Sequence, residues 1–325
     1  MYSPVIHVEN LKKAYNEINA VNDVSFSIYK GDVYGYLGHN GAGKTTTMRL
    51  LLGLLKPDYG TIKVLSENPY DETTIQRSIR TRIGVLLEKD ALYQNMTGWD
   101  NLAYWAQLYG CRKCDIANIV DSVIELVGIR NRCLTLVRTY SKGMCRQLSI
   151  ARALLGKPEL LFLDEPTSGL DPIARVHVRQ ILANIVSSGQ CTIFLCSHDL
   201  EEVEKLCNRV LVIRNGKEIA SGYVEELTHQ QPEVVIQLKH DFRSALPEGI
   251  RMQLEQIESI TSYTMVNNKL YLRLLGYDIV PTIVTAIVSS GALIESIEHR
   301  NTSLENIYYS IAKKSDTMNI ESYNE

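Results

Sequence analysis

The stretch from Gly38 to Thr45, Gly-His-Asn-Gly-Ala-Gly-Lys-Thr, constrains the fold of this chain more than any other feature. It has the spacing G-x-x-x-x-G-K-T, with a short apolar run at 33–37 before it and a helix-forming run at 46–55 after it. A strand, a glycine-rich loop and a helix together surround phosphate oxygens with backbone N–H groups and the positive end of the helix. The sequence therefore predicts a nucleoside triphosphate site, and the alternative is a chance glycine-rich turn.

Side chains and backbone of this loop have separate expected roles. Lys44 reaches the β- and γ-phosphates, and the hydroxyl of Thr45 ligates Mg²⁺. The other expected nucleotide contacts come from the loop and the first helical turn, at Gly38, Asn40, Gly41, Ala42, Gly43 and Thr46.

Three predicted buried strands each end in polar residues. The run 83–87 ends at Glu88, the run 160–163 ends at Asp164 and Glu165, and the run 191–196 leads to His198. Ligands of open α/β sheets bind at the carboxyl ends of the strands, so we expect these side chains to meet at one edge.

Two adjacent acids after a buried strand have distinct expected roles beside a phosphate loop. We expect Asp164 on the metal side and Glu165 as the catalytic base that polarises the attacking water. An acidic cap at a helix entry is the alternative interpretation. For His198 a satisfied loop histidine and a functional residue remain equal alternatives on position alone.

The segments around this core predict two additional parts of the same domain. The runs 5–8 and 24–28 alternate like half-buried strands of an antiparallel sheet, and Tyr15 lies between them, as a base-stacking residue or an ordinary tyrosine. Residues of about 89–139 read as a helical insertion, with a capping-box pattern at 97–100. Tyr140 to Met144 then opens a helix at 145–155, which predicts either a second anion site or only a cap.

Composition limits the class of protein. The 325 residues suffice for one large domain and a small one, and a formal net charge of −3 argues against a nucleic-acid binder that works by neutralising phosphates. Seven cysteines, scattered from Cys111 to Cys207, suit a reducing compartment, and Cys111 and Cys114 lack the second pair of a zinc site. We expect no secretory signal, because residues 1–8 show no basic region followed by an apolar one. We expect no membrane span, because the longest uncharged run, 279–294, is too short and contains Pro281 and Gly291.

The remaining residues predict a second domain. We place the boundary at 230/231, with a nucleotide domain at 1–230 and a small α+β domain at 231–325 that regulates or dimerises. The latter contains a hairpin at Asn267-Asn268, a helix at 278–290, a strand at 293–298 and a helix at 303–312.

Taken together, these motifs resemble the ATP-binding subunit of an ABC transporter over about residues 4–230. Gly38 to Thr45 is similar to the Walker A loop, and 160–164 to Walker B, with Glu165 at the catalytic glutamate position. Tyr140 to Met144 resembles the family signature, which is usually Leu-Ser-Gly-Gly-Gln. Residues 168–171 resemble the D-loop, and His198 resembles the switch histidine. Tyr15 stands at the position of the aromatic residue that stacks on adenine.

The resemblance implies a fold, cofactors and partners. The fold class is α/β, a P-loop NTPase of ABC type with a mostly parallel core sheet, an antiparallel β subdomain and a helical insertion. ATP and Mg²⁺ are the implied cofactors, with Thr45, Glu88 and Asp164 on the metal. Two subunits pair head to tail as a homodimer or heterodimer, so that Ser141, Gly143 and Asp171 of one complete the nucleotide site of the other. The pair drives an integral membrane permease from the cytoplasmic face, and no nucleic acid is expected.

Two departures from the family pattern stand out. Glu88 replaces the usual Q-loop glutamine and adds negative charge near the metal. The signature has Lys142 and Met144 for glycine and glutamine, and Arg146-Gln147 follows where many members read Gln-Arg. The variant signature and the C-terminal extension resemble exporter ATPases of the bacitracin and daunorubicin resistance type.

Two other functions compete with transport. One is a soluble ABC ATPase that acts on the ribosome or on nucleic acid, which the single set of motifs and the absence of long heptads disfavour. The other is a catalytically quiet regulatory subunit, against which the intact Lys44, Asp164, Glu165 and His198 argue.

Overall fold

The computed structural model describes residues 3–71, 79–189, 191–228, 233–239, 247–300 and 304–305. The chain divides into two compact units, unit 1 at Met1–Tyr223 and unit 2 at Val224–Glu325. The boundary expected at 230/231 lies outside the described residues. Among the residues that are described, none of the helices is long and apolar enough to cross a membrane.

Three antiparallel strands form the first sheet of unit 1, in the order β2-β1-β4. Their bounds are β1 Ile6–Tyr15, β2 Ile18–Ile28 and β4 Tyr59–Val64. Most of the polar residues between the expected strands at 5–8 and 24–28 belong to β1 and β2 themselves, and Tyr15 pairs with Ile18 at the tip of a hairpin. Polar residues are accommodated there because they are exposed while the backbone bonds of the ladder continue.

A six-stranded sheet, in the order β5-β6-β7-β3-β8-β9, carries the candidate site. Neighbouring strands run parallel except β8 and β9. The bounds are β3 Val33–Leu37, β5 Ile83–Leu86, β6 Leu160–Asp164, β7 Thr192–Ser197, β8 Arg209–Arg214 and β9 Lys217–Tyr223. Every residue of β3, β6 and β7 is buried, which explains why these strands appear in the sequence as uninterrupted apolar runs.

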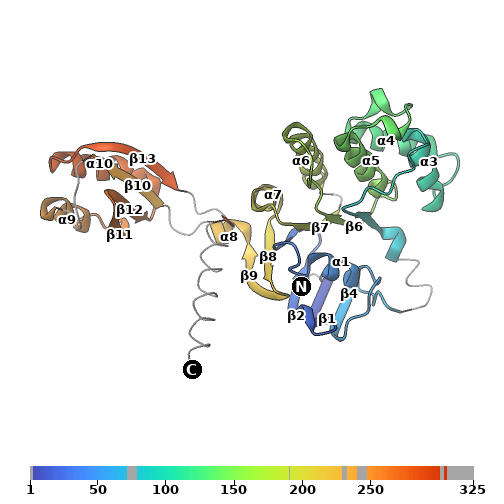
Figure 1. The fold of residues 1–325 in the computed structure, drawn as a ribbon, viewed down its shortest axis with the longest axis horizontal. Coiled ribbons are helices and arrows are strands. Elements are labelled where there is room, and N and C mark those ends of the chain that lie inside the picture. The colour runs from blue at the N-terminus through green and yellow to red at the C-terminus, as the bar shows by residue number, and fades with distance from the viewer. Residues whose placement is uncertain are drawn as a thin grey trace. The chain divides into compact units, whose positions relative to one another are not determined.

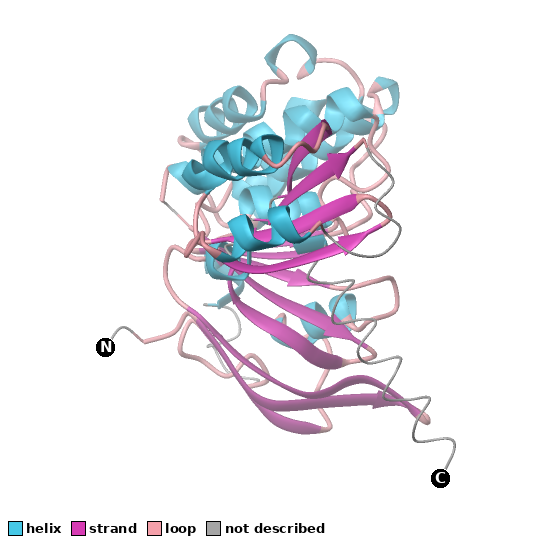
Figure 2. Ribbon diagram, turned by 90° about the vertical axis from the view of Figure 1, so that its left-hand side faces the viewer, coloured by secondary structure: helices cyan, strands magenta, loops and turns pink. Residues whose placement is uncertain are grey.

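Figure 2 distinguishes the helices, in cyan, from the strands, in magenta. The bounds are α1 Lys44–Leu51, α3 Gly98–Leu108, α4 Ile116–Val127, α5 Lys142–Leu154, α6 Pro172–Ser187 and α7 Leu200–Leu206, with short 3₁₀ turns η1 Arg130–Arg132 and η2 Val137–Thr139. Helices α3, α4 and α5 pack on one another between β5 and β6 along the chain (Figure 1). Helix α3 begins as predicted, because the hydroxyl of Thr97 accepts a hydrogen bond from the N–H of Asp100.

One hydrophobic core joins the two sheets of unit 1. Helix α1 contacts β2, β4 and β7, and its buried apolar residues Met48, Leu50 and Leu51 belong to the same cluster as buried residues of both sheets. Phe26 of β2 stacks on Tyr34 of β3 at 5.5 Å between ring centroids, with Phe194 of β7 at 6.2 Å from Phe26. The loop between β3 and α1 is therefore supported by packing on both sides.

Unit 2 is a small α+β fold with strand order β11-β12-β10-β13, all antiparallel. Its βαββαβ succession is that of the ferredoxin-like motif. The bounds are α8 Val224–Thr228, β10 Glu233–Leu238, α9 Glu248–Glu255, β11 Ile260–Val266, β12 Lys269–Leu274, η3 Tyr277–Ile279, α10 Val280–Ser289 and β13 Ile294–Arg300. Helix α10 and strand β13 agree with the helix and strand expected there, whereas only residues 304 and 305 of the helix expected at 303–312 are described.

Gly84 of β5 provides a test of how closely α5 packs on the sheet. A Cβ atom at Gly84 would lie 2.2 Å from the carbonyl oxygen of Ala153 in α5. We expect Gly84→Ala to lower the free energy of unfolding by about 1–3 kcal/mol, because backbone must move. In Gly156→Ala the new atom meets only the oxygen of Thr81 at 3.5 Å, so this control should stay within about 0.5 kcal/mol of the parent. Urea denaturation of both variants measures the difference, and equal midpoints would contradict the close packing.

Candidate functional site

The loop between β3 and α1 is held open as a cradle by its glycines. Gly41 and Gly43 have φ angles of 85° and 110°, in the left-handed region that favours glycine. A Cβ atom at Gly43 would lie 2.1 Å from the carbonyl oxygen of Ala20, so no other residue fits there. Gly43 caps α1 without a side-chain hydrogen bond, which leaves N–H groups of the first turn for an anion.

Lys44 lies inside this cradle and is only 6% exposed. Its Nζ donates hydrogen bonds to the carbonyl oxygens of Gly38 at 2.7 Å and His39 at 3.3 Å, and it lies 3.2 Å from Oε1 of Glu165. These bonds keep the Lys44 side chain along the loop, where its ammonium group could also donate hydrogen bonds to phosphate oxygens.

Asp164 and Thr45 meet at the ends of β6 and α1. The Thr45 hydroxyl donates to Oδ2 of Asp164 at 3.4 Å, and Oδ1 of Asp164 is buried without a hydrogen-bond partner among the described residues. Burial raises the pKa of Asp164, and the neighbouring charges of Glu165 and Glu88 raise it further. A buried carboxylate of this kind is stabilised by a cation.

A magnesium ion fits this donor set. Mg²⁺ usually takes one or two carboxylates, and phosphate and water complete its octahedron. Asp164, Glu88 and the Thr45 hydroxyl supply such oxygens. Within the described parts of the chain there is no cluster of three or more His, Cys, Asp or Glu residues that could hold a metal by itself, so the ion would need phosphate oxygens as well.

Glu165 is oriented by two basic groups. Oε2 of Glu165 accepts a hydrogen bond from Nδ1 of His198 at 2.7 Å, while Oε1 faces Lys44. The backbone of Glu165 is left-handed, with φ of 49°, and its N–H donates to the carbonyl oxygen of Cys196 in β7. The neighbouring strand thus positions the carboxylate at the end of β6.

These groups line one cavity of about 390 Å³. Of the side chains and loop positions that we predicted as a site, the cavity is lined by Tyr15, Asn40, Gly41, Gly43, Lys44, Thr45, Thr46, Glu88, Glu165 and His198. Tyr15 is 45% exposed, so its ring is accessible to a ligand. Gly38, Ala42 and Asp164 belong to the same loop and strand end, but they are not part of the lining.

Ser141, Gly143 and Asp171 do not line this cavity. Ser141 caps α5 by accepting from the N–H of Met144, and Asp171 caps α6 by accepting from the N–H groups of residues 173 and 174. Gly143 packs against α6, where a Cβ atom would lie 2.7 Å from Cβ of Ala174. The exposed starts of α5 and α6 therefore form a separate surface.

Several lining residues were not predicted. Ser168, His39 and Ala20 also face the cavity. His39 lies inside the loop motif and Ser168 in the turn after Glu165, so their neighbours in the sequence were the available signal. Position 20 carries no such signal, because only the tertiary fold brings the carbonyl oxygen of Ala20 against Gly43 of the loop.

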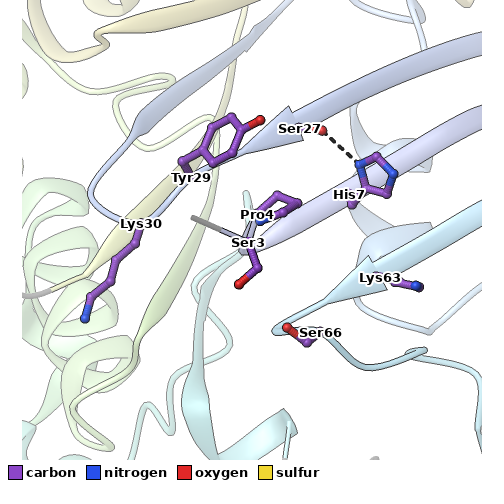
Figure 3. A pocket seen from close by; sticks show the side chains of 8 residues that line it. All are labelled: Ser3, Pro4, His7, Ser27, Tyr29, Lys30, Lys63 and Ser66. Carbon is purple, nitrogen blue, oxygen red and sulfur yellow. Dashed lines mark hydrogen bonds between the residues drawn. The ribbon is translucent and has the colours of Figure 1, made fainter. Parts of the chain in front are cut away.

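A larger pocket of about 960 Å³ lies elsewhere, along the outer part of the antiparallel sheet. Figure 3 shows its lining, in which His7 is hydrogen-bonded to Ser27 at 2.8 Å. The other ring nitrogen of His7 bonds to Glu9, whose side chain is 58% exposed. The glycine-rich loop lines the smaller cavity and not this one, so the larger volume does not identify the candidate nucleotide site.

Comparison with known proteins agrees with this geometry. Residues 21–168 match the family model described as ABC transporter. The chain is 42% identical over 215 residues to the bacitracin transport ATP-binding protein of Bacillus licheniformis, covering 66% of this chain and 68% of that protein. It is 37% identical to a Nod factor export ATP-binding protein of Ralstonia nicotianae, over 79% of each chain, and 38% identical to the linearmycin resistance ATP-binding protein of Bacillus subtilis, over 69% and 70%.

Solved structures show the same fold. The cbiO1 protein of Clostridium perfringens, part of the ABC transporter complex cbiONQ, superposes with a TM-score of 0.64 and 27% identity, covering 70% of this chain and 91% of that one. An ATP-binding subunit of an ABC transporter superposes with a TM-score of 0.61, also at 27% identity, over 70% and 92%.

Asp164 provides a stability test of the site. Its raised folded-state pKa means that its ionisation costs stability as pH rises above about 4, the ordinary aspartate value. Without metal and nucleotide, Asp164→Asn should therefore stabilise the chain at neutral pH by about 0.5–2 kcal/mol while removing activity, and the gain should shrink toward pH 4. Thermal melts at several pH values measure it.

Asp58 is the matched control for this experiment. Hydrogen bonds from the Ala14 N–H and Lys13 lower its pKa, so Asp58→Asn should lower the melting temperature instead. The same sign of change in both variants would contradict the electrostatic account.

Proposed function

Because this chain belongs to the ABC transporter family, whose ATP-binding subunits hydrolyse ATP to power transport, we propose that it drives the export of a drug or antimicrobial peptide. The observation that carries the enzymatic part is the position of Glu165 between Lys44 and His198 at a phosphate loop. The named functions of the relatives, bacitracin transport, Nod factor export and linearmycin resistance, support export.

ATP and Mg²⁺ are the proposed cofactors. The loop N–H groups and Lys44 bind the phosphates, Tyr15 stacks on the adenine, and Thr45, Asp164 and Glu88 hold the metal. The bound ion would neutralise charge on the β- and γ-phosphate oxygens. Glu88 in place of an amide adds a carboxylate, which we expect to tighten metal binding.

Glu165 and His198 have paired roles in this proposal. Glu165 accepts a proton from the attacking water, and its carboxylate is already oriented by the Nδ1–H of His198. His198 is 47% exposed, so it can also contact the γ-phosphate side of the cavity. Lys44 holds the other carboxylate oxygen until phosphate oxygens compete for its ammonium.

The site is proposed to be completed by a second ATP-binding subunit. Ser141 and Asp171 are exposed at the N-termini of α5 and α6, apart from the cavity, and Gly143 is buried where α5 packs on α6. A head-to-tail pair places these N-termini of one copy over the phosphate loop of the other. The N–H groups at the start of α5 then face the γ-phosphate.

The partner and location follow from the same proposal. The pair acts at the cytoplasmic face of a membrane through an integral permease, and unit 2 is a regulatory or dimerising module. Relatives at this level of identity are named as transport, export or resistance ATP-binding proteins, which favours this function over action on the ribosome or nucleic acid.

Glu165→Gln tests the proposed base. The amide keeps the shape but cannot accept a proton, so we expect ATP binding to persist while turnover falls at least about 10²-fold and a closed dimer accumulates. Glu159→Gln, at the opposite end of β6, alters only an exposed pair with Arg82 and should retain parent turnover. Phosphate release and size-exclusion chromatography with ATP measure both. Hydrolysis at the parent rate by the Glu165 variant would refute its role.

Dilution tests the shared site. A site built from two copies loses activity when the pair dissociates, whereas Lys44 should still bind ATP in the monomer. Turnover per chain should therefore fall through the dimerisation range, measured alongside mass by light scattering. A constant turnover in a sample shown to be monomeric would rule out the shared site.

A further inference from the structure

Arg146 is a buried cation on α5 that points toward the sheet. It is 3% exposed, and its two terminal nitrogens have different targets. Nη1 donates to the carbonyl oxygen of Leu87 at 2.7 Å and lies 3.2 Å from Oδ1 of Asp90, and Nη2 donates to the carbonyl oxygen of Glu165 at 2.8 Å. One guanidinium therefore connects α5 to the ends of both β5 and β6.

The first of these ends carries Glu88. Leu87 and Asp90 stand before and after Glu88, and Arg146 bonds to both. Glu88 itself lines the nucleotide cavity. The side chain of Arg146 thus holds the loop at 87–90 in place, and Glu88 of that loop lines the cavity.

The same face of α5 binds the loop twice more. Ser149 donates to the carbonyl oxygen of Asp90 at 3.3 Å, and Arg152 donates to those of Asp90 and Ala91, each at 2.9 Å. Positions 146, 149 and 152 are three apart, so they share one side of the helix. This strap, Arg146 with Ser149 and Arg152, makes the loop move with α5.

The second strand end carries Glu165. A non-glycine residue with φ of 49° is strained, so bonds from neighbouring groups are needed to hold it in this conformation. The carbonyl of Glu165 accepts from Arg146 and from the N–H of Ser168 at 3.2 Å. Because the peptide orientation sets the direction of the carboxylate, Arg146 acts on the alignment of Glu165 with Lys44 and His198.

The geometry points to Arg146 as a positioning residue that makes α5, the Glu88 loop and the Glu165 turn one mechanical element. Given the proposed function, on which this inference rests, the start of α5 contacts the nucleotide of the second copy while Glu165 serves the nucleotide of its own chain. Arg146 then couples the two ATP sites of the dimer through a single side chain.

Only the guanidinium has the required shape. Its planar fork places donors on both sides with a fixed angle and keeps its charge when buried. A lysine ammonium could pair with Asp90 but could not bridge Leu87 and Glu165 together. Gln147, the next residue, bonds instead to the carbonyl oxygen of Val127 in α4, so an arginine moved to 147 would not reach these groups.

Arg146→Lys and Arg146→Gln test the inference with the full-length chain. We expect at least a tenfold lower kcat, an ATP dissociation constant of the monomer within twofold of the parent, and a Hill coefficient for ATP that falls toward 1. The Arg146→Gln/Gln147→Arg exchange should not recover kcat. Arg146→Lys keeps charge and approximate volume, so it is informative even if the glutamine variant fails to fold.

Gln147→Ala is the matched control on the same helix. It removes one bond to α4, so its melting temperature should fall while kcat and the Hill coefficient remain near the parent values. Parent-like kcat and cooperativity in Arg146→Lys, or recovery of both in the exchange variant, would overturn the inference.

If the proposed site shared between two copies is wrong, the parent protein itself behaves differently. The parent protein would then show constant turnover per chain on dilution and no cooperativity. The effect of Arg146 on the alignment of Glu165 would still be read from kcat in Arg146→Lys, so the two failures can be told apart.

Discussion

The buried ammonium of Lys44 is the charge on which the candidate site depends. It balances two loop carbonyls and the carboxylate of Glu165 in a region that also contains the unpartnered oxygen of Asp164. Such a cluster of charges is costly without phosphate and a cation, because each group has lost part of its water. The energetic imbalance of the free site would therefore be the basis of the affinity that we propose for a metal–nucleotide pair.

The cradle holds Lys44 in place because two sheets share a core. Phe26 of the antiparallel sheet stacks on Tyr34 of the parallel one, and α1 packs against both. The parallel order of β5, β6 and β7 then brings Glu88, Glu165 and His198 to one edge, even though these residues are far apart in the sequence. Catalytic geometry here is a consequence of strand register.

Helix α5 connects that edge to the remainder of unit 1. Arg146 bonds to the ends of two strands, while Ser141 at the start of the same helix is not part of the cavity lining. In the proposed dimer, a rigid helix with Ser141 at its start and Glu165 bonded to its side would transmit a displacement of about an ångström between two sites. Such small displacements are enough to change rates strongly.

The sequence by itself determined the local elements of the site: the phosphate loop, the buried strands with their acidic ends, and the cap of α3 at Thr97. These were predictable because glycine spacing, apolar runs and capping chemistry act between near neighbours. Only the tertiary structure decided which distant groups meet. The carbonyl oxygen of Ala20 lies against Gly43 of the loop, although the two residues are far apart in the sequence. Strand β1 extends through polar residues because its backbone pairs with β2 and β4 on its two sides. Arg146 binds Leu87 and Glu165 because α5 lies beside the ends of two strands. Contacts of this kind depend on packing across the chain, which no local pattern encodes.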